Sequence, residues 1–137
     1  MTVAALAARL IQSFEGIRLT SYWDVTGKVW TIGYGHTKNV AGGTVITQAE
    51  ADIFFVADCA PLLLMVAGKP MLEAAALVSF GFNCGAGALA GVLRGDIALA
   101  AYGLTSHGVR LPGLVARRML EAALIEVSKE NENAKLS

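Results

Sequence analysis

The chain has 137 residues, close to the commonest size of one domain and long enough to bury a core of its own. Its 11 basic and 11 acidic residues cancel, so the overall charge points neither to nucleic acid nor to an anionic membrane as a partner. We therefore expect a single domain over residues 1–137 that binds its ligand through local contacts.

Hydropathy requires a test for membrane insertion, because the sequence is 55% hydrophobic with a mean hydropathy of +0.55. The most apolar stretch, IFFVADCAPLLLMVAG over residues 53–68, is shorter than the roughly 20 residues of a spanning helix, and Asp58 and Pro61 interrupt it. It is typical of a buried helix. The N-terminus has no basic leader and is interrupted by Arg9, so no signal peptide is predicted.

The first predicted element is an amphipathic helix over residues 2–14, TVAALAARLIQSF. Its apolar residues recur at helical spacing, and Thr2 can cap its start. β-Branched and aromatic residues then run from Leu19 to Thr37 around a turn signal at Thr26-Gly27. This change of composition predicts a small antiparallel hairpin.

Helices are predicted for most of the remaining chain. Thr47 and Glu50 have the spacing of a capping box, which predicts the start of a second helix after a glycine-rich loop. Further helices are expected to restart at Pro61, in MLEAAALVSFGFN, after CGAG, in DIALAAYG from Asp96, and in PGLVARRMLEAALIEVSKE from Pro112. Residues 130–137 are polar and predict a frayed tail. The layout predicts an α+β fold with a ligand cleft between a small sheet and a larger helical body.

Two carboxylates, Glu15 and Asp24, stand on either side of the expected helix-to-sheet junction. Glu15 follows Phe14 at the end of an apolar helix, so we expect it to be partly buried, as suits a general acid. Asp24 lies in the polar part of the hairpin. Two carboxyls in unlike surroundings are the arrangement that hydrolyses glycosidic bonds, although helix capping and a solvated turn would give the same spacing.

The order Glu15, Asp24 and then TIGYGHT resembles the catalytic motif of phage-type lysozymes, the endolysins of glycoside hydrolase family 24. Three later segments are similar to motifs of the same family: ALVSFGFNCGAGAL, RGD followed by alanines, and LPGLVARRMLE. The resemblance covers residues 10 to 126. It implies a lysozyme-like α+β fold in which the hairpin flanks the active-site cleft.

The resemblance implies roles for three residues and a substrate. Glu15 matches the general acid, Asp24 the second carboxylate, and Thr31 the hydroxyl that helps to hold the attacking water. The implied reaction is hydrolysis of the β-1,4 bond between N-acetylmuramic acid and N-acetylglucosamine in peptidoglycan, causing host lysis. The implied protein is a monomer without a cofactor or metal, with no stable membrane insertion, that accumulates in the host cytoplasm and reaches the wall through holin lesions.

Two segments depart from the family pattern. Six residues, VTGKVW, separate Asp24 from Thr31, which is one more than the family commonly has. The segment AGVLRGDIALAAYGLTSHGVRLPG, residues 90–113, is short and lacks the family's tryptophan. We therefore expect a longer hairpin turn and a trimmed helical wall of the cleft.

Aromatic residues of the hairpin are candidates for sugar binding, because an aromatic plane can cover the apolar face of a sugar. Tyr22, Trp23, Trp30 and Tyr34 belong to this group, and by strand alternation about half of them are expected to point into the core. His36 follows the hairpin, where it could touch substrate or make a structural hydrogen bond. The predicted substrate-binding residues are Tyr22, Trp30, Tyr34 and His36.

Arg117 and Arg118 lie where the family has an arginine cluster. One of them could reach back to pair with Glu15. Alternatively, Arg117 pairs with Glu121 four residues along a solvated helix face.

The cysteine and histidine residues do not predict a metal site. Cys59 and Cys84 lack the paired spacing of a zinc or redox motif, so we expect buried free thiols, with a single disulfide as the alternative. His36 and His107 have no third ligand-like cluster beside them, and His107 is expected to be exposed.

Three other interpretations remain open beside the hydrolase. A lysozyme fold with a weak or inactive site would bind glycan without cutting it, although the presence of both Glu15 and Asp24 favours catalysis. A membrane-associated helical protein would account for the high hydropathy. A transglycosylase would leave a 1,6-anhydro end on its product.

Overall fold

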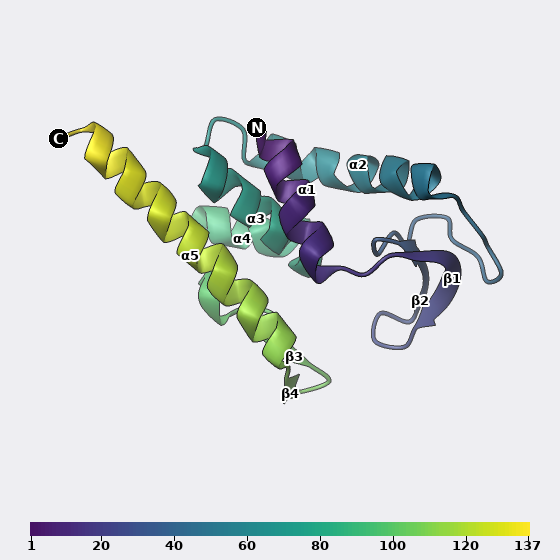
Figure 1. The fold of residues 1–137 in the computed structure, drawn as a ribbon. Helices are drawn as coiled ribbons and strands as arrows, with labels where there is room; N and C mark the ends of the chain where they lie inside the picture. The colour runs from purple at the N-terminus through teal and green to yellow at the C-terminus, as the bar shows by residue number, and fades with distance from the viewer.

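The computed structural model describes residues 1–137 as a mainly helical body with a β-hairpin set to one side (Figure 1). The chain after α1 and the chain before α2 connect the hairpin to this body. The elements, in chain order, are α1 (Val3–Phe14), β1 (Arg18–Asp24), β2 (Val29–Gly33), α2 (Gln48–Met65), α3 (Met71–Cys84), α4 (Ala86–Arg94), the 3-10 turn η1 (Leu99–Ala101), β3 (Thr105–Ser106), β4 (Val109–Arg110) and α5 (Pro112–Lys135). The predicted α+β arrangement, a small antiparallel sheet beside a larger helical body, is confirmed.

Helix α1 begins at the predicted cap. The Thr2 hydroxyl accepts a hydrogen bond from the Ala5 amide at 3.0 Å, which satisfies one of the free donors of the first turn. The helix buries Ala7, Leu10 and Ile11 against the helical body. It ends at Phe14, and Glu15 takes an extended conformation as the chain turns toward β1.

Strands β1 and β2 form the predicted antiparallel hairpin, with Tyr22 opposite Thr31 and Trp23 opposite Trp30. Because successive side chains of a strand point to opposite faces, Tyr22, Asp24 and Thr31 share one face of the hairpin. Trp23 and Trp30 occupy the other face, where their rings meet edge to face with centroids 5.6 Å apart. The register therefore sorts the candidate residues into a polar face and a tryptophan face.

Helix α2 starts with the predicted capping box, in which Thr47 and Glu50 bond each other's backbone amides. The predicted restart at Pro61 is wrong, because one helix runs through Pro61 to Met65. Proline removes one backbone donor, but Phe55, Cys59 and Leu62 anchor the helix in the core on both sides of it. Neither α2 nor any other helix has the length and hydropathy needed to cross a bilayer.

Helix α3 is the centre of the helical body and packs against α1, α2, α4 and α5. Eight consecutive residues, Ala74 to Gly81, are buried, most of them small. Gly81 permits the closest approach: a Cβ there would lie 2.9 Å from Leu89 of α4 and 3.0 Å from Leu62 of α2. Three helices therefore meet around a position that only glycine fits without displacing its neighbours.

The helix predicted from Asp96 is wrong. Gly95 ends α4 in a left-handed conformation, and the amides of Asp96 and Ile97 both donate to the Gly91 carbonyl. The Asp96 carboxylate accepts from Arg94 at 2.9 Å, so it does not cap a new helix. Only the short turn η1 follows, and the chain then forms the two-residue strands β3 and β4.

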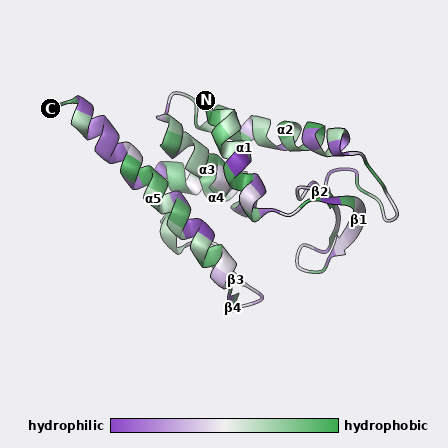
Figure 2. Ribbon diagram, viewed as in Figure 1, coloured by the Kyte–Doolittle hydropathy of each residue, from purple (hydrophilic) through white to green (hydrophobic).

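Helix α5 continues to Lys135, across most of the segment for which the sequence predicted a frayed tail. Figure 2 shows that its last turns are strongly hydrophilic. Ion pairs at i, i+3 join Glu126 to Lys129 and Glu132 to Lys135, and these pairs favour helix at the chain end. Farther back, the same helix carries a group of buried charges that face α3 and the end of α1.

Candidate active site

Glu15 lies just beyond the end of α1, where its amide donates to the Ile11 carbonyl at 2.8 Å. Its side chain is 27% exposed, so the carboxyl is half-buried as the sequence predicted. The Arg117 guanidinium donates from Nη1 to Glu15 Oε1 at 2.7 Å and also lies over the Phe14 ring. The predicted return of an α5 arginine to Glu15 is confirmed.

Arg117 also makes the alternative pairing with Glu121, but both side chains are buried, so the predicted solvated helix face is wrong. Its Nε donates to Glu121 at 3.4 Å and to the Ser79 hydroxyl at 3.3 Å, and its Nη2 donates to the Ser79 carbonyl at 3.0 Å. Arg118 forms two bonds to Glu121, at 2.6 and 3.0 Å. Two cations and two carboxylates therefore balance each other between α3, α5 and Glu15.

Tyr22 links the two candidate carboxylates electrostatically. Burial raises the pKa of the Tyr22 hydroxyl, the negative charges of Asp24 and Glu15 raise it further, and Arg18 partly offsets them. Arg18 lies over the Tyr22 ring, with its guanidinium carbon 4.6 Å from the centroid. Both acids thus act on one tyrosine of the polar hairpin face.

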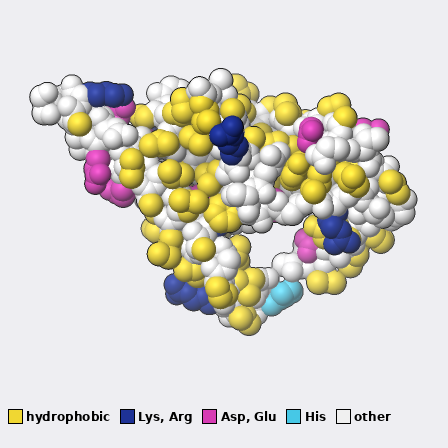
Figure 3. All heavy atoms as spheres, in the orientation of Figure 1, with side chains coloured by type: hydrophobic (Ala, Val, Ile, Leu, Met, Phe, Trp, Pro, Cys, Tyr) yellow, Lys and Arg dark blue, Asp and Glu magenta, His cyan; other side chains and the backbone are white.

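Two adjoining hollows hold the carboxylates. The first, of about 450 Å³, is lined by Glu15 and Arg117 with the start of α5. The second, of about 470 Å³, is lined by Asp24 with the segment from Tyr102 to Ser106. Asn83, Leu111 and Leu114 border both, so the two hollows adjoin and together make up the candidate cleft. Figure 3 shows this region as an opening between the helical body and the hairpin.

Asp24 and Thr31 occupy the cleft-facing side of the hairpin, but their side chains differ in exposure. Asp24 Oδ1 accepts from the Thr26 amide at 2.9 Å, which fixes the carboxylate at the turn and leaves it half-buried. Thr31 is only 3% exposed, and its hydroxyl donates to the Val29 carbonyl at 3.3 Å. The Thr31 oxygen keeps acceptor capacity, so its predicted contact with water stays a prediction.

The structure separates the predicted sugar-binding aromatics. Tyr22 lies beside the acids, whereas Trp30 lies on the opposite face and covers Gly42, where a Cβ would come within 2.7 Å of the indole. Tyr34 packs edge to face on Phe55 of α2, at 5.3 Å between centroids, and its hydroxyl accepts from Gln48. Of these three, only Tyr22 has a pKa that both carboxylates raise.

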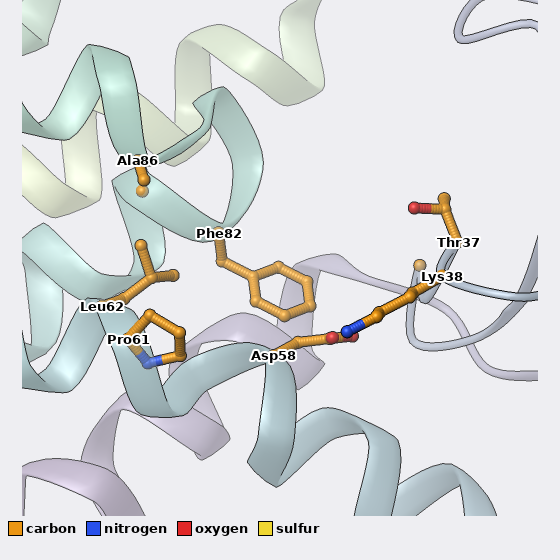
Figure 4. Close-up of a pocket in the computed structure, with 9 residues that line it drawn as sticks. Thr37, Lys38, Asp58, Pro61, Leu62, Phe82 and Ala86 are labelled. Carbon is orange, nitrogen blue, oxygen red and sulfur yellow. The ribbon is translucent and has the colours of Figure 1, made fainter.

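His36 links the hairpin to α2. Its Nδ1 lies 2.8 Å from Asp58 Oδ2, its ring stacks on Phe54 at 4.3 Å, and it is only 8% exposed. This position favours the structural hydrogen bond over the predicted contact of His36 with substrate. Asp58 also borders a third hollow, of about 300 Å³, into which Phe82 and Lys38 extend (Figure 4).

Both cysteines are free, which excludes the alternative of a disulfide. Burial, and secondarily Asp58, raise the pKa of Cys59 to about 12. Burial also raises the pKa of Cys84, and Arg118, which donates to its sulfur at 2.7 Å, opposes that rise. No three His, Cys, Asp or Glu side chains gather in a group that could hold a metal ion.

Sequence reasoning missed the partners of several site residues. Asp58 was visible as a single charge within an apolar helix, which signals a partner elsewhere, but nothing local identified His36. Arg18 beside Tyr22 carried no sequence signal. The contact between Thr26 and His107, at 3.2 Å across the cleft, also joins segments that no local pattern connects.

Comparison with known proteins identifies the family of the chain. The phage lysozyme family model matches residues 12–121 of the chain. The endolysin of Acyrthosiphon pisum secondary endosymbiont phage 1 is 35% identical over 136 residues, covering 85% of this chain and 92% of that protein. The endolysin of Bacillus phage PZA is also 35% identical; the alignment covers 90% of this chain but only 55% of that longer protein.

Solved structures show the same fold. The muramidase domain of SpmX from Asticaccaulis excentricus has a TM-score of 0.73 and 28% identity, covering 90% of this chain and 97% of that domain. The endolysin of Escherichia coli O157:H7 phage FAHEc1 has a TM-score of 0.72 and 28% identity, covering 91% of this chain and 93% of that one. With the family model matching most of the sequence, this chain belongs to the phage lysozyme family.

Proposed function

We propose that this protein is a muramidase that hydrolyses the β-1,4 bond between N-acetylmuramic acid and N-acetylglucosamine in peptidoglycan, and that it serves host lysis as an endolysin. The observation that carries the proposal is the pair of carboxylates in one cleft, one held by a buried arginine and the other at the hairpin turn. Membership of the phage lysozyme family supports the same reaction.

Glu15 acts as the general acid in this proposal. Arg117 occupies Oε1 of the carboxyl at 2.7 Å, which leaves Oε2 to carry the proton that the leaving glycosidic oxygen receives. The fixed guanidinium also limits rotation of the side chain. The proton is therefore delivered from a constant direction, as an oriented acid requires.

Asp24 stabilises the positive charge that develops on the sugar and assists attack by water. Its carboxylate is oriented by the Thr26 amide and borders the hollow that adjoins the Glu15 hollow. Thr31 lies on the same hairpin face and would help to hold the water, and Tyr22 would contact the sugar between the acids.

Access to the wall and oligomeric state belong to the proposal as well. We propose a single-domain monomer whose partner is the glycan strand of the host wall, reached from the cytoplasm through holin lesions. The two adjoining hollows already contain both acids on one chain, so catalysis needs no second copy.

The test is the release of reducing ends from purified peptidoglycan by the parent protein and by two isosteric variants, Glu15→Gln and Asp24→Asn. We expect the parent to release them and Glu15→Gln to be slower by roughly 10²- to 10⁴-fold, because it cannot donate a proton. Glu126→Gln, the same change at an exposed ion pair of α5, is the matched control. Glycan binding without reducing ends from the folded parent would replace the enzyme with a binding protein.

A further inference from the structure

A hydrogen bond joins the two hairpins across the cleft. Thr26 Oγ1 lies 3.2 Å from His107 Nε2, although 81 positions separate the two residues in the sequence. Thr26 stands in the turn between β1 and β2, and His107 stands in the turn between β3 and β4. Both side chains are exposed, so neither is placed there by burial in the core.

The backbone at His107 is unusual for a residue with a side chain. His107 has a φ of +51° and Gly108 a φ of +77°, which are the left-handed values of a tight two-residue hairpin turn. Asparagine or glycine normally occupies the first of these positions, because other residues are disfavoured there. The chain accepts this cost and places an imidazole at the tip that meets Thr26.

The contact completes a ring around the cleft. The hollow beside Asp24 is lined by Thr26 from one hairpin and by Thr105 and Ser106 from the other. Figure 3 shows an opening whose lower edge is closed by a histidine side chain and its neighbours between the helical body and the hairpin. The chain between α1 and β1 closes the opposite side (Figure 1).

The two partners come from the two segments that depart from the family pattern. Thr26 belongs to the turn for which the resemblance predicted one extra residue, and His107 belongs to the segment after α4 for which it predicted a trimmed wall. These two segments therefore meet each other. This pairing gives both departures one structural consequence, a bridged cleft.

We propose that Thr26 and His107 form a clasp that must open before an uncut glycan strand can enter the cleft sideways; the inference rests on the proposed action on peptidoglycan glycan. Short glycan fragments and strand ends enter beneath the closed clasp. A single exposed hydrogen bond is weak, so the clasp opens reversibly and selects among substrates instead of blocking the site. The two residues are determinants of substrate specificity, not catalytic residues.

The test measures binding separately from cleavage. In a Glu15→Gln background, the association rate of long uncrosslinked glycan strands is compared with that of short soluble muropeptide oligomers. His107→Asn keeps a residue that tolerates the left-handed turn but is too short to reach Thr26. With His107→Asn, we expect long strands to associate about two- to tenfold faster than with the protein that keeps His107, which is the range that one lost hydrogen bond allows. Short oligomers should associate equally fast with both proteins.

Two further variants show whether the pair acts as a unit. Thr26→Val removes only the hydroxyl, and combined with His107→Asn it should raise the ratio of long-strand to short-oligomer rates no more than either change alone. Val109→Thr, an exposed change in the same hairpin, is the matched control and should leave the ratio unchanged.

An unchanged ratio in both clasp variants, or slower association of both substrates alike, would overturn the clasp. Absence of glycan binding in every variant would overturn it too. Because cleavage is measured separately with Glu15 intact, an inactive parent whose clasp variants still bind long strands faster would overturn the muramidase proposal alone.

Discussion

Arg117 Nη1 lies 2.7 Å from Glu15 Oε1, although 102 positions separate the two residues. The contact joins the last helix to the end of the first and places a cation at the proposed general acid. Because Glu121 and Ser79 hold the other nitrogens of the same guanidinium, the position of Glu15 depends on groups that never touch substrate. Arg117 is therefore a positioning residue.

Replacing Arg117 with lysine should lower kcat more than it changes KM. Lysine keeps the positive charge but cannot bond Glu15, Glu121 and the Ser79 carbonyl together, because it lacks the planar fork of arginine. A displaced acid costs up to about 100-fold in rate. Steady-state kinetics on soluble glycan measure kcat and KM separately, and Arg110→Lys on the exposed strand β4 is the control. Equal kcat in both variants would refute the positioning role.

Replacing Glu121 with glutamine should destabilise the fold. The carboxylate is fully buried and balances both Arg117 and Arg118, so its loss leaves buried positive charge without compensation. The expected loss is about 3–5 kcal/mol in the free energy of unfolding, measured by urea titration. Glu126→Gln, at an exposed ion pair of the same helix, should change it by less than about 1 kcal/mol.

His36→Asn should weaken the attachment of the hairpin to α2. The change removes the 2.8 Å contact with Asp58 and the stacking on Phe54, and a hydrogen bond to a charged group contributes about 1.5–3 kcal/mol. Urea unfolding measures the loss, with Lys38→Met as an exposed control in the same segment. If His36 instead contacts substrate, the variant will keep its stability and lose glycan affinity.

Stability should fall at alkaline pH, in part because of Cys59. The pKa of Cys59 is about 12 in the folded protein, against a usual value of 9.0, so the unfolded chain releases this proton first. The contribution is fully present below pH 9 and is lost as pH rises toward 12, at about 1.4 kcal/mol per pH unit. Urea titrations over this range should show a shallower decline for Cys59→Ala. Equally steep losses of stability in the parent and in Cys59→Ala would contradict the contribution assigned to Cys59.

Local signals predicted the parts of the fold whose causes lie within a few residues. The Thr2 cap, the capping box of Thr47 and Glu50, and the Thr26-Gly27 turn all depend on bonds between near neighbours. The helix starts predicted at Pro61 and Asp96 are wrong because contacts with distant parts of the fold or with the preceding helix decide the structure there. Core packing carries α2 through the proline, and the return of the chain to Gly91 removes the helix expected after Asp96.

The candidate site was predictable only as a set of residue types. The resemblance named Glu15, Asp24 and Thr31. Strand alternation predicted that about half of the hairpin aromatics point into the core, which is wrong for Trp23 and Trp30, because both lie on the exposed outer face. The contact partners of Asp58 and His107 were not predictable, because these residues meet their partners only through tertiary folding. For Arg117 the sequence could state the pairing with Glu15 only as one of two possibilities.

The measurement that tests the central claim most directly is mass spectrometry of the soluble fragments released from purified peptidoglycan in ¹⁸O-labelled water. Hydrolysis by Glu15 and Asp24 transfers the oxygen of water to the new reducing end, so the parent should release muropeptides that carry the label, and Glu15→Gln should release essentially none. Unlabelled fragments with 1,6-anhydro ends, or label release that persists in Glu15→Gln, would contradict the account.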